Sequence, residues 1–199
     1  QQAGPILTEL SVRSIPLFEE IMTEEDIQCE YHKNGFLLLF NNPKAFQKAQ
    51  DLNETLAQWE ISGQILDTEE LLERFPPALP DLAGGIFYED DAHLDPAVFN
   101  HKLALKAQSH GAQILTGREV LDFTVENQRI REVHTTTGTY LADQIILAAG
   151  AWSPEIGRHL DLRIPVQAAK GYSITVKRPK DYPEIPLILD EAKIAVTPL

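Results

Sequence analysis

The chain has 199 residues, which is enough for one large domain or two small ones with a substantial apolar core. Its 30 acidic residues outnumber 17 basic ones, and the formal net charge of −13 repels a phosphate backbone, so nucleic-acid binding is excluded as its main function. A single cysteine, Cys29, leaves no internal disulfide and favours a reducing, cytoplasmic compartment.

The first part of the chain predicts two helices separated by a strand. Apolar residues recur at helical spacing over residues 6–22, which predicts a helix with one buried face, kinked or divided at Pro16. Residues 35–40 are typical of a short strand, and Asn42 can cap a helix over residues 43–60. The inward face of this second helix should consist of Phe46, Ala49, Leu52, Leu56 and Trp59.

Capping signals mark the next elements. Residues 67–70, Asp-Thr-Glu-Glu, have the capping-box spacing of a short helix that should end before the prolines at 76–77. Residues 84–88 are typical of a strand. Asp95 can cap a further helix that begins with proline and ends near Ser109.

A β-rich segment follows that helix. Gly111 should close the helix in the left-handed conformation, and residues 113–115 predict a strand. Alternating polar and apolar residues then predict an antiparallel meander with a turn at Asn127 and Gln128. The three strands of this meander should occupy residues 118–126, 129–137 and 138–142.

Residues 144–153, Gln-Ile-Ile-Leu-Ala-Ala-Gly-Ala-Trp-Ser, predict a buried strand that ends in small residues. Its apolar half can be covered on both faces, and the small residues allow a close approach of the backbone to a neighbour. Ligands of open α/β sheets bind outside the carboxyl ends of strands, so a nucleotide cofactor would fit here. A strand with a plain turn explains the pattern equally well. Residues 164–176 and 186–196 predict further strands.

Several common catalytic and binding motifs are missing. The glycines do not have the spacing of the dinucleotide fingerprint Gly-x-Gly-x-x-Gly or of a phosphate-binding loop. The six histidines are scattered, so the sequence predicts no metal site. His93 stands just before a helix cap and more readily supports that turn than acts as a base, so no catalytic residue is assigned.

Three passages carry a resemblance to a known family: residues 91–96 (Asp-Ala-His-Leu-Asp-Pro), residues 144–153, and residues 165–173 (Pro-Val-Gln-Ala-Ala-Lys-Gly-Tyr-Ser). Together they resemble the FAD-dependent D-amino-acid oxidase family, and more narrowly glycine oxidase and the small subunit of D-amino-acid dehydrogenase. The resemblance spans nearly the whole chain. Residues 170–175 and 188–197 favour the dehydrogenase branch.

The resemblance implies a mixed α/β (α+β) fold, with a substrate-binding antiparallel sheet and helices beside an incomplete FAD-binding part made of a β-meander and a parallel strand. Residues 1–90 and 162–199 would belong to the substrate domain and residues 91–161 to the FAD-binding domain. The family's N-terminal fingerprint and its C-terminal segment are missing. We therefore expect a fragment that does not hold FAD by itself.

The resemblance also implies the residues of a cofactor site. Val120 matches the position whose backbone faces the adenine, and Ala148, Ala149 and Gly150 match the turn beside the pyrophosphate. Trp152 follows that turn, where it could shield the cofactor or be an ordinary packed tryptophan.

Two residues correspond to positions near the substrate. Tyr172 lies where the family's chain returns towards the flavin ring, although a core tyrosine explains it equally well. Lys193 stands where glycine oxidase presents an aromatic substrate contact. This departure agrees with the dehydrogenase branch.

The activity implied by the resemblance is oxidation of a D-amino acid, or of glycine, at the α-carbon. Hydride transfer to the flavin gives an imino acid, which water hydrolyses to a keto acid and ammonia, and no protein base is required. Transfer of the electrons to a quinone would favour peripheral attachment to the inner membrane. Two alternatives stay open: this chain itself is a non-catalytic substrate-domain module, or its parent resembles sarcosine oxidase or glycerol-phosphate dehydrogenase.

Overall fold

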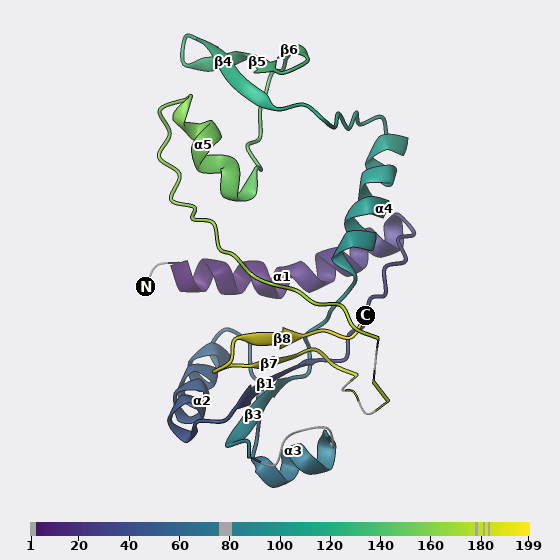
Figure 1. Cartoon of the computed structure of the whole chain (residues 1–199), viewed down its shortest axis with the longest axis vertical. Coiled ribbons are helices and arrows are strands. Elements are labelled where there is room, and N and C mark those ends of the chain that lie inside the picture. Colours follow the sequence, from purple (N-terminus) through teal and green to yellow (C-terminus); the bar gives the residue numbers. More distant parts are fainter. Residues whose placement is uncertain (1–2, 76–80, 178, 181, 183) are drawn as a thin grey trace. The chain divides into compact units, whose positions relative to one another are not determined.

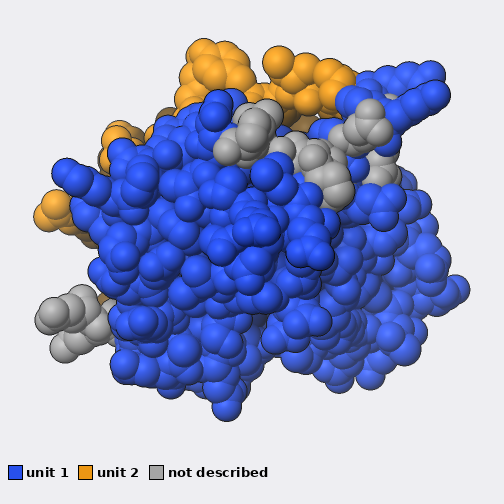
Figure 2. Space-filling view, turned by 90° about the horizontal axis from the view of Figure 1, so that it is seen from below, with its two compact units in different colours: residues 1–112, 177–199 blue, residues 113–176 orange. Residues whose placement is uncertain are grey.

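The computed structural model describes residues 3–75, 81–177, 179–180, 182 and 184–199. The chain divides into two compact units (Figures 1 and 2). Unit 1 comprises residues 1–112 and 177–199, and unit 2 comprises residues 113–176. The domain boundaries that the family resemblance implies are defined by substrate and FAD binding rather than by compactness. They stay a prediction.

The first two helices of unit 1 lie where the sequence places them. Helix α1 (Ala3–Glu24) continues through Pro16 as one helix rather than being divided. Helix α2 (Pro43–Ala57) begins after Asn42, whose side chain accepts hydrogen bonds from the backbone N–H groups at positions 44 and 45. The caps predicted from local sequence therefore form.

The other two helices of unit 1 also begin at their predicted caps. Helix α3 (Thr68–Arg74) has the capping box between Asp67 and Glu70, and the prolines at 76–77 that were expected to end it lie outside the described residues. Helix α4 (Pro96–Ser109) is capped by Asp95. Gly111 follows it with a φ of +95°.

The sheet of unit 1 has five strands in the order β2-β3-β1-β7-β8 (Figure 1). Strand β1 pairs antiparallel with β3 and parallel with β7, and the remaining neighbours are antiparallel. The mixed α/β class is therefore confirmed. The strands are β1 (Phe36–Phe40), β2 (Gln64–Leu66), β3 (Gly84–Tyr88), β7 (Leu187–Leu189) and β8 (Ile194–Val196).

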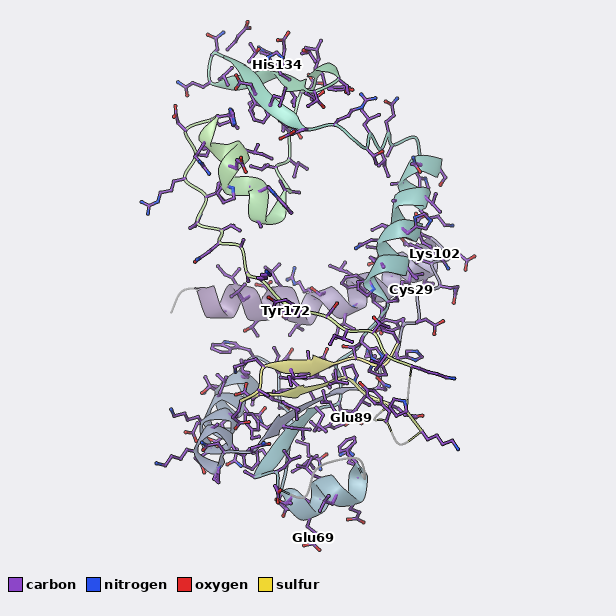
Figure 3. All side chains as sticks on the ribbon, viewed as in Figure 1. Cys29, Glu69, Glu89, Lys102, His134 and Tyr172 are labelled. Atoms are coloured by element: carbon purple, nitrogen blue, oxygen red, sulfur yellow. The ribbon has the colours of Figure 1, made fainter. Side chains whose placement is uncertain are left out.

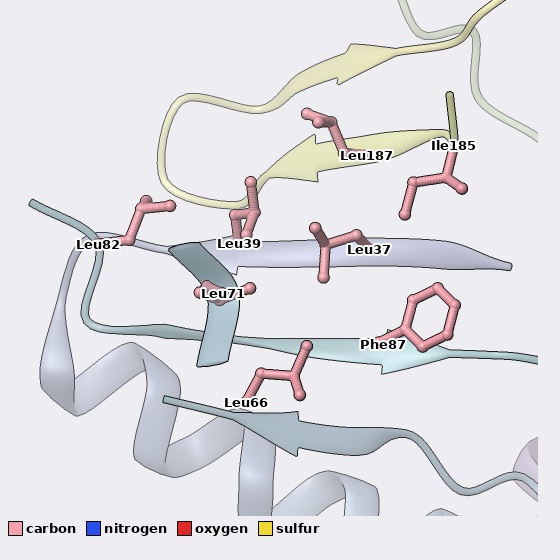
Figure 4. Packing of buried hydrophobic residues seen from close by; sticks show 8 residues of the cluster. All are labelled: Leu37, Leu39, Leu66, Leu71, Leu82, Phe87, Ile185 and Leu187. Carbon is pink, nitrogen blue, oxygen red and sulfur yellow. The ribbon is translucent and has the colours of Figure 1, made fainter. Parts of the chain in front are cut away.

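Both faces of this sheet bury apolar side chains, because alternate residues of a strand point to opposite faces. On one face, Leu71 of α3 belongs to a cluster with residues of β1, β2, β3 and β7. On the other face, Phe46 of α2 packs with Phe40 and Ile86. The first cluster is shown in Figure 4 and consists of Leu37, Leu39, Leu66, Leu71, Leu82, Phe87, Ile185 and Leu187.

Unit 2 contains the predicted meander of β4 (Val120–Glu126), β5 (Arg129–Thr135) and β6 (Gly138–Leu141). Asn127 and Gln128 form the first turn, with φ values of 50° and 62°. Two consecutive residues with positive φ are what a tight hairpin turn requires. A 3-10 helix, η1 (Gly150–Trp152), and helix α5 (Ser153–Arg158) follow.

Three predicted strands are wrong. Residues 113–115, 144–149 and 164–176 contain no strand. An extended segment becomes a strand only when a neighbour exchanges backbone hydrogen bonds with it, and these segments belong to neither sheet. The burial predicted for residues 145–148 is likewise absent, since Ile146 is 89% exposed.

The predicted buried faces of the first two helices are only partly correct. Along α1, Ile6, Leu7 and Leu10 are exposed, whereas Met22, at its C-terminal end, is buried in a cluster with Phe99 of α4. Apolar spacing indicates which side of a helix can pack, but it does not supply the surface that covers it.

In α2, Leu52 is exposed, and the buried positions are Phe46 and Asn53. Trp59, expected on the inward face of this helix, lies beyond its end and is exposed as well. Asn53 is buried, and its side chain forms hydrogen bonds with the backbone of Gly63.

Within the described residues, no helix combines the length and apolar character needed to cross a membrane.

Candidate functional site

The turn at residues 148–152 is an open corner of backbone in unit 2. Gly150 has a φ of +54°, and a Cβ atom built on it would meet no heavy atom within 4 Å. The N–H group of Trp152 donates to the carbonyl of Ala149 over 3.1 Å, which closes the η1 turn. The Trp152 side chain is 69% exposed. The corner therefore presents bare backbone beside an exposed aromatic ring.

Helix α5 connects this corner to the meander. It starts directly after Trp152 and contacts β4, the strand that begins with Val120. At the end of α5, His159 Nδ1 lies 3.5 Å from Asp122 Oδ1 of β4. All five residues that the sequence assigns to the cofactor thus lie in unit 2, with Val120 half-buried and Ala148 exposed.

The close approach of α5 to the following segment depends on a glycine. Gly157 is buried, and a Cβ atom there would lie 2.8 Å from Cδ1 of Ile164. This glycine lets residues 162–164 pack directly against the helix. The packing holds α5, and with it the corner at Gly150, within unit 2.

Tyr172 is a surface residue rather than a core tyrosine. Its side chain is 89% exposed, and Lys170 Nζ lies 5.4 Å from the centre of its ring (Figure 3). The ammonium group over the ring face is a cation–π contact. Tyr172 belongs to unit 2.

Lys193 lies in unit 1, in the turn between β7 and β8. Its φ is 52°, which is uncommon for a residue with a side chain. Its Nζ atom lies 3.0 Å from Asp190 Oδ1, while 75% of its side chain is exposed. The turn therefore presents an ammonium group to solvent.

Sequence reasoning missed the residue that holds this turn. The carboxylate of Glu191 accepts hydrogen bonds from the backbone N–H groups of Asn41, at 3.1 Å, and Asn42, at 3.0 Å. Partial burial raises the pKa of Glu191, but these backbone hydrogen bonds and Lys193 lower it more, so the pKa lies below its usual value. Glu191 thus ties the β7–β8 turn to the corner between β1 and α2. No local pattern signals a contact across about 150 residues.

The described residues of unit 2 fit contacts with a nucleotide cofactor through backbone. The corner at Gly150 has space on its outer side, and the exposed Trp152 offers an apolar surface beside it. Nowhere in the described part of the chain do three His, Cys, Asp or Glu side chains converge to hold a metal ion. The arrangement favours a ligand held by backbone and aromatic contacts.

Comparison with known proteins identifies the family and the fold of the chain. The pattern of the DAO family, described as FAD dependent oxidoreductase, matches residues 2–198. D-amino acid dehydrogenase from Cereibacter sphaeroides is 35% identical over 198 residues, covering 97% of this chain and 45% of that protein. D-amino acid dehydrogenase from Rhizobium rhizogenes is 31% identical, covering 90% of this chain and 44% of that protein.

A solved structure shows the same fold. The crystal structure of glycine oxidase from Bacillus cereus superposes with a TM-score of 0.78 at 19% identity, covering 96% of this chain and 53% of that one. At this identity the likeness concerns the fold alone. The chain spans about half the length of the proteins that it matches.

Proposed function

The chain belongs to the DAO family of FAD-dependent oxidoreductases, and on that premise we propose that the protein containing it oxidises the α-carbon of a D-amino acid, or of glycine. The product would be an imino acid, which water hydrolyses to a keto acid and ammonia. The observation that carries the proposal is the match over residues 2–198, together with relatives named D-amino acid dehydrogenase at 31% and 35% identity.

Unit 2 would supply one part of the cofactor site. The backbone of Val120 would face the adenine, and the backbone of Ala148, Ala149 and Gly150 would lie beside the pyrophosphate. Trp152 would shield the cofactor from water. The open space at Gly150 and the exposure of Trp152 support this assignment. Acceptance of the hydride is the chemistry that FAD supplies when it is bound.

Tyr172 and Lys193 would contact the substrate. Lys193 presents an ammonium group that can pair with a carboxylate, which every amino-acid substrate carries. A substrate with a neutral amine needs no protein base, so the protein would act by orienting the α-carbon and excluding water. This role is consistent with the sequence analysis, which assigned no catalytic residue.

The remaining partners follow from the same proposal. The substrate would be a small-molecule amino acid, and the parent protein would pass its electrons to a quinone through peripheral contact with the inner membrane. Activity that rises when a soluble quinone analogue is added to the parent protein would support this acceptor. Equal rates with molecular oxygen alone would contradict it.

We further propose that this chain by itself is a non-catalytic module. The corner at Gly150 is open, residues 144–149 before it pair with no strand, and Ile146 among them is 89% exposed. The purified 199-residue chain should be colourless, and it should stay so after incubation with FAD and desalting. Retained flavin absorbance at one FAD per chain, or turnover, would contradict this proposal without touching the family assignment.

Substrate assays of the parent protein test the reaction itself. D-amino acids, glycine, sarcosine and glycerol phosphate should be offered separately with an artificial electron acceptor, and ammonia should be measured as a product. Turnover of D-amino acids or glycine with release of ammonia is the expected result. A preference for sarcosine or glycerol phosphate would instead favour the other flavoenzyme classes, and indifference to every amine would overturn the amino-acid assignment.

A variant of Lys193 tests its proposed contact. Lys193→Asn removes the ammonium group but keeps a residue that tolerates positive φ. We expect KM for the amino acid to rise by about tenfold, as for a lost charge-assisted hydrogen bond of about 1.5 kcal/mol, with a smaller change in kcat. Lys48→Asn, on the exposed side of α2, is the control. An unchanged KM would exclude Lys193 from the substrate site.

A further inference from the structure

Two segments of unit 1 are joined by a short ladder centred on a pair of histidines. The N–H group of His32 donates to the carbonyl of His93 and the N–H group of His93 to the carbonyl of His32, both at 2.9 Å. Asp95 N donates to Cys29 O at 2.9 Å, and Gly35 N donates to Asp91 O at 3.0 Å. This ladder links the segment between α1 and β1 to the segment between β3 and α4.

The two imidazole rings lie against each other across the ladder. Their centres are 5.3 Å apart, and the planes are inclined by 33°. Nδ1 of His93 is buried and has no hydrogen-bond partner among the described residues. In a neutral ring Nδ1 can carry only a lone pair, which needs no hydrogen-bond partner. A protonated ring would place an N–H group there with no acceptor, close to a second histidine.

We propose that the His32–His93 ladder is an acid-sensitive latch, which is closed when His93 is neutral and opens when His93 takes up a proton. The latch is independent of the proposed oxidoreductase activity, because its parts lie entirely in unit 1 and include no residue assigned to cofactor or substrate. A proton on Nδ1 of His93 at the closed ladder would have neither water nor an acceptor beside it, so protonation favours separation of the two segments.

The groups around the latch include some that raise the pKa of His93 and some that lower it. Burial lowers the pKa of His93, and His32 lowers it further, while a backbone hydrogen bond with Pro198 and the charge of Asp91 raise it; the net shift is downward. Glu30 Oε2 lies 3.8 Å from Nε2 of His32.

Three further titratable groups belong to the segments around the latch or to α4. Burial first, and then a hydrogen bond to Glu19 of α1, raise the pKa of Tyr31 to about 12, so its hydroxyl stays neutral. Asp95 is engaged with the first N–H groups of α4. Lys102 of α4 donates to the carbonyl of Gln28 at 2.6 Å.

The direction of the pH effect follows from the lowered pKa of His93. Above about pH 6.5 the ring is neutral in both the open and the closed state, so the latch is fully stable. As the pH falls below that value, the open state binds the proton and the closed state does not, so the closed state loses stability. The loss ends when the pH passes the pKa of the closed state.

Opening would have a defined consequence. His93 lines a cavity of about 470 Å³ between α1, the two ladder segments and the C-terminal residues. The wall is mainly apolar and includes Ile15, Phe18 and Leu94. The cavity is already open to solvent, since Phe18 is 39% exposed, and separation of the ladder would widen it and loosen the contact between the C-terminal end of α1 and α4.

Nuclear magnetic resonance on the 199-residue chain tests the latch. The ring signals of His93 should titrate below pH 6.5. The exchange protection of the His32 and His93 amides, corrected for intrinsic rates, should fall by up to about tenfold per pH unit below 6.5. The amide of Ile86, in the centre of the sheet, should remain protected over the same range.

Three variants separate the latch from general acid sensitivity. His93→Phe and His93→Gln remove the titrating ring, and the acid-induced loss of protection at the His32 amide should disappear. His101→Gln, at an exposed site on α4, should behave as wild type. If a His93 variant does not fold, the titration of the wild-type chain decides by itself. A His93 ring that titrates at 6.5 or above, or a ladder that keeps its protection, would overturn the proposal.

Discussion

The two units differ in how much apolar side chain each buries by itself. In unit 1 both faces of the sheet are covered, and the exposure of Leu37, Leu66, Leu71 and Ile86 is 1% or less. In unit 2 Ser153 and Gly157 are the buried residues. Its most exposed apolar side chains are Leu141, Ile146, Tyr172 and Ile174, at 78%, 89%, 89% and 86%. A local meander can thus form on backbone pairing without a core, whereas the sheet of unit 1 depends on long-range packing.

The largest expected effect comes from emptying the core of unit 1. Ile86→Ala should lower the free energy of unfolding by about 2 to 5 kcal/mol, because Ile86 is fully buried against Phe40 and Phe46. The matched change in unit 2, Ile146→Ala, should cost less than about 0.5 kcal/mol. Urea unfolding of both variants measures the difference. Equal losses would mean that unit 2 has a core of its own.

A buried polar contact should come next. Asn53 bonds Gly63 twice, with its Nδ2 donating to the carbonyl at 2.8 Å and its Oδ1 accepting from the N–H at 2.7 Å. Asn53→Ala should cost about 1 to 3 kcal/mol, because partly buried backbone groups lose their partners. The comparison in unit 2 is Thr124→Val, which removes a half-exposed hydroxyl that contacts Glu132 and His134 and should cost at most about 1 kcal/mol. A larger loss of stability for Thr124→Val than for Asn53→Ala would contradict the contrast between the units.

Helix caps should have a smaller effect. Asp95→Ala should lower the stability of unit 1 by about 1 kcal/mol, since two N–H groups at the start of α4 lose their acceptor. Asp95→Asn, which keeps an acceptor oxygen, should restore most of it. In unit 2 the start of α5 has no side-chain cap to lose. Thermal unfolding followed by circular dichroism measures these changes, and equal stability of all three chains would show that α4 does not need this cap.

The smallest effect concerns the pH dependence of Glu191. Its folded-state pKa lies below its unfolded value, so its contribution to stability is present above about pH 4.3 and is lost as the pH falls through the folded-state pKa. Because the residue is exposed, Glu191→Gln should lower Tm at pH 7 by no more than about 2 to 4 °C and should make no difference at pH 3. Glu89→Gln, at an exposed site, is the control. A Tm difference that persists at pH 3 would mean that packing, rather than charge, is lost.

Much of the local structure could be predicted because its causes are local. The caps at Asn42, Asp67 and Asp95 place helix starts correctly, since a short side chain meets N–H groups only two or three residues ahead. The turn at Asn127 and Gln128 likewise depends on residues that tolerate positive φ. The family resemblance added the cofactor class, which no periodicity could have supplied.

The predictions that were wrong concern features that depend on a second segment of the chain. Residues 144–149 have the composition of a buried strand, yet backbone pairing with a neighbour decides whether such a segment becomes one. In the same way, the apolar spacing of α1 shows which side of the helix can pack, but only the position of α4 decides that Met22 is buried and Leu10 is not.

The sequence by itself determined the four helices of unit 1 with the caps of three of them, the meander with its first turn, and the family to which the chain is similar. Only the tertiary structure decided which apolar faces are covered, that Glu191 holds the β7–β8 turn at the corner before α2, and that His32 meets His93. The physical reason is distance along the chain. Hydrogen bonds within a few residues follow from the residues themselves, whereas burial and long-range pairing require a partner that the three-dimensional arrangement must bring close.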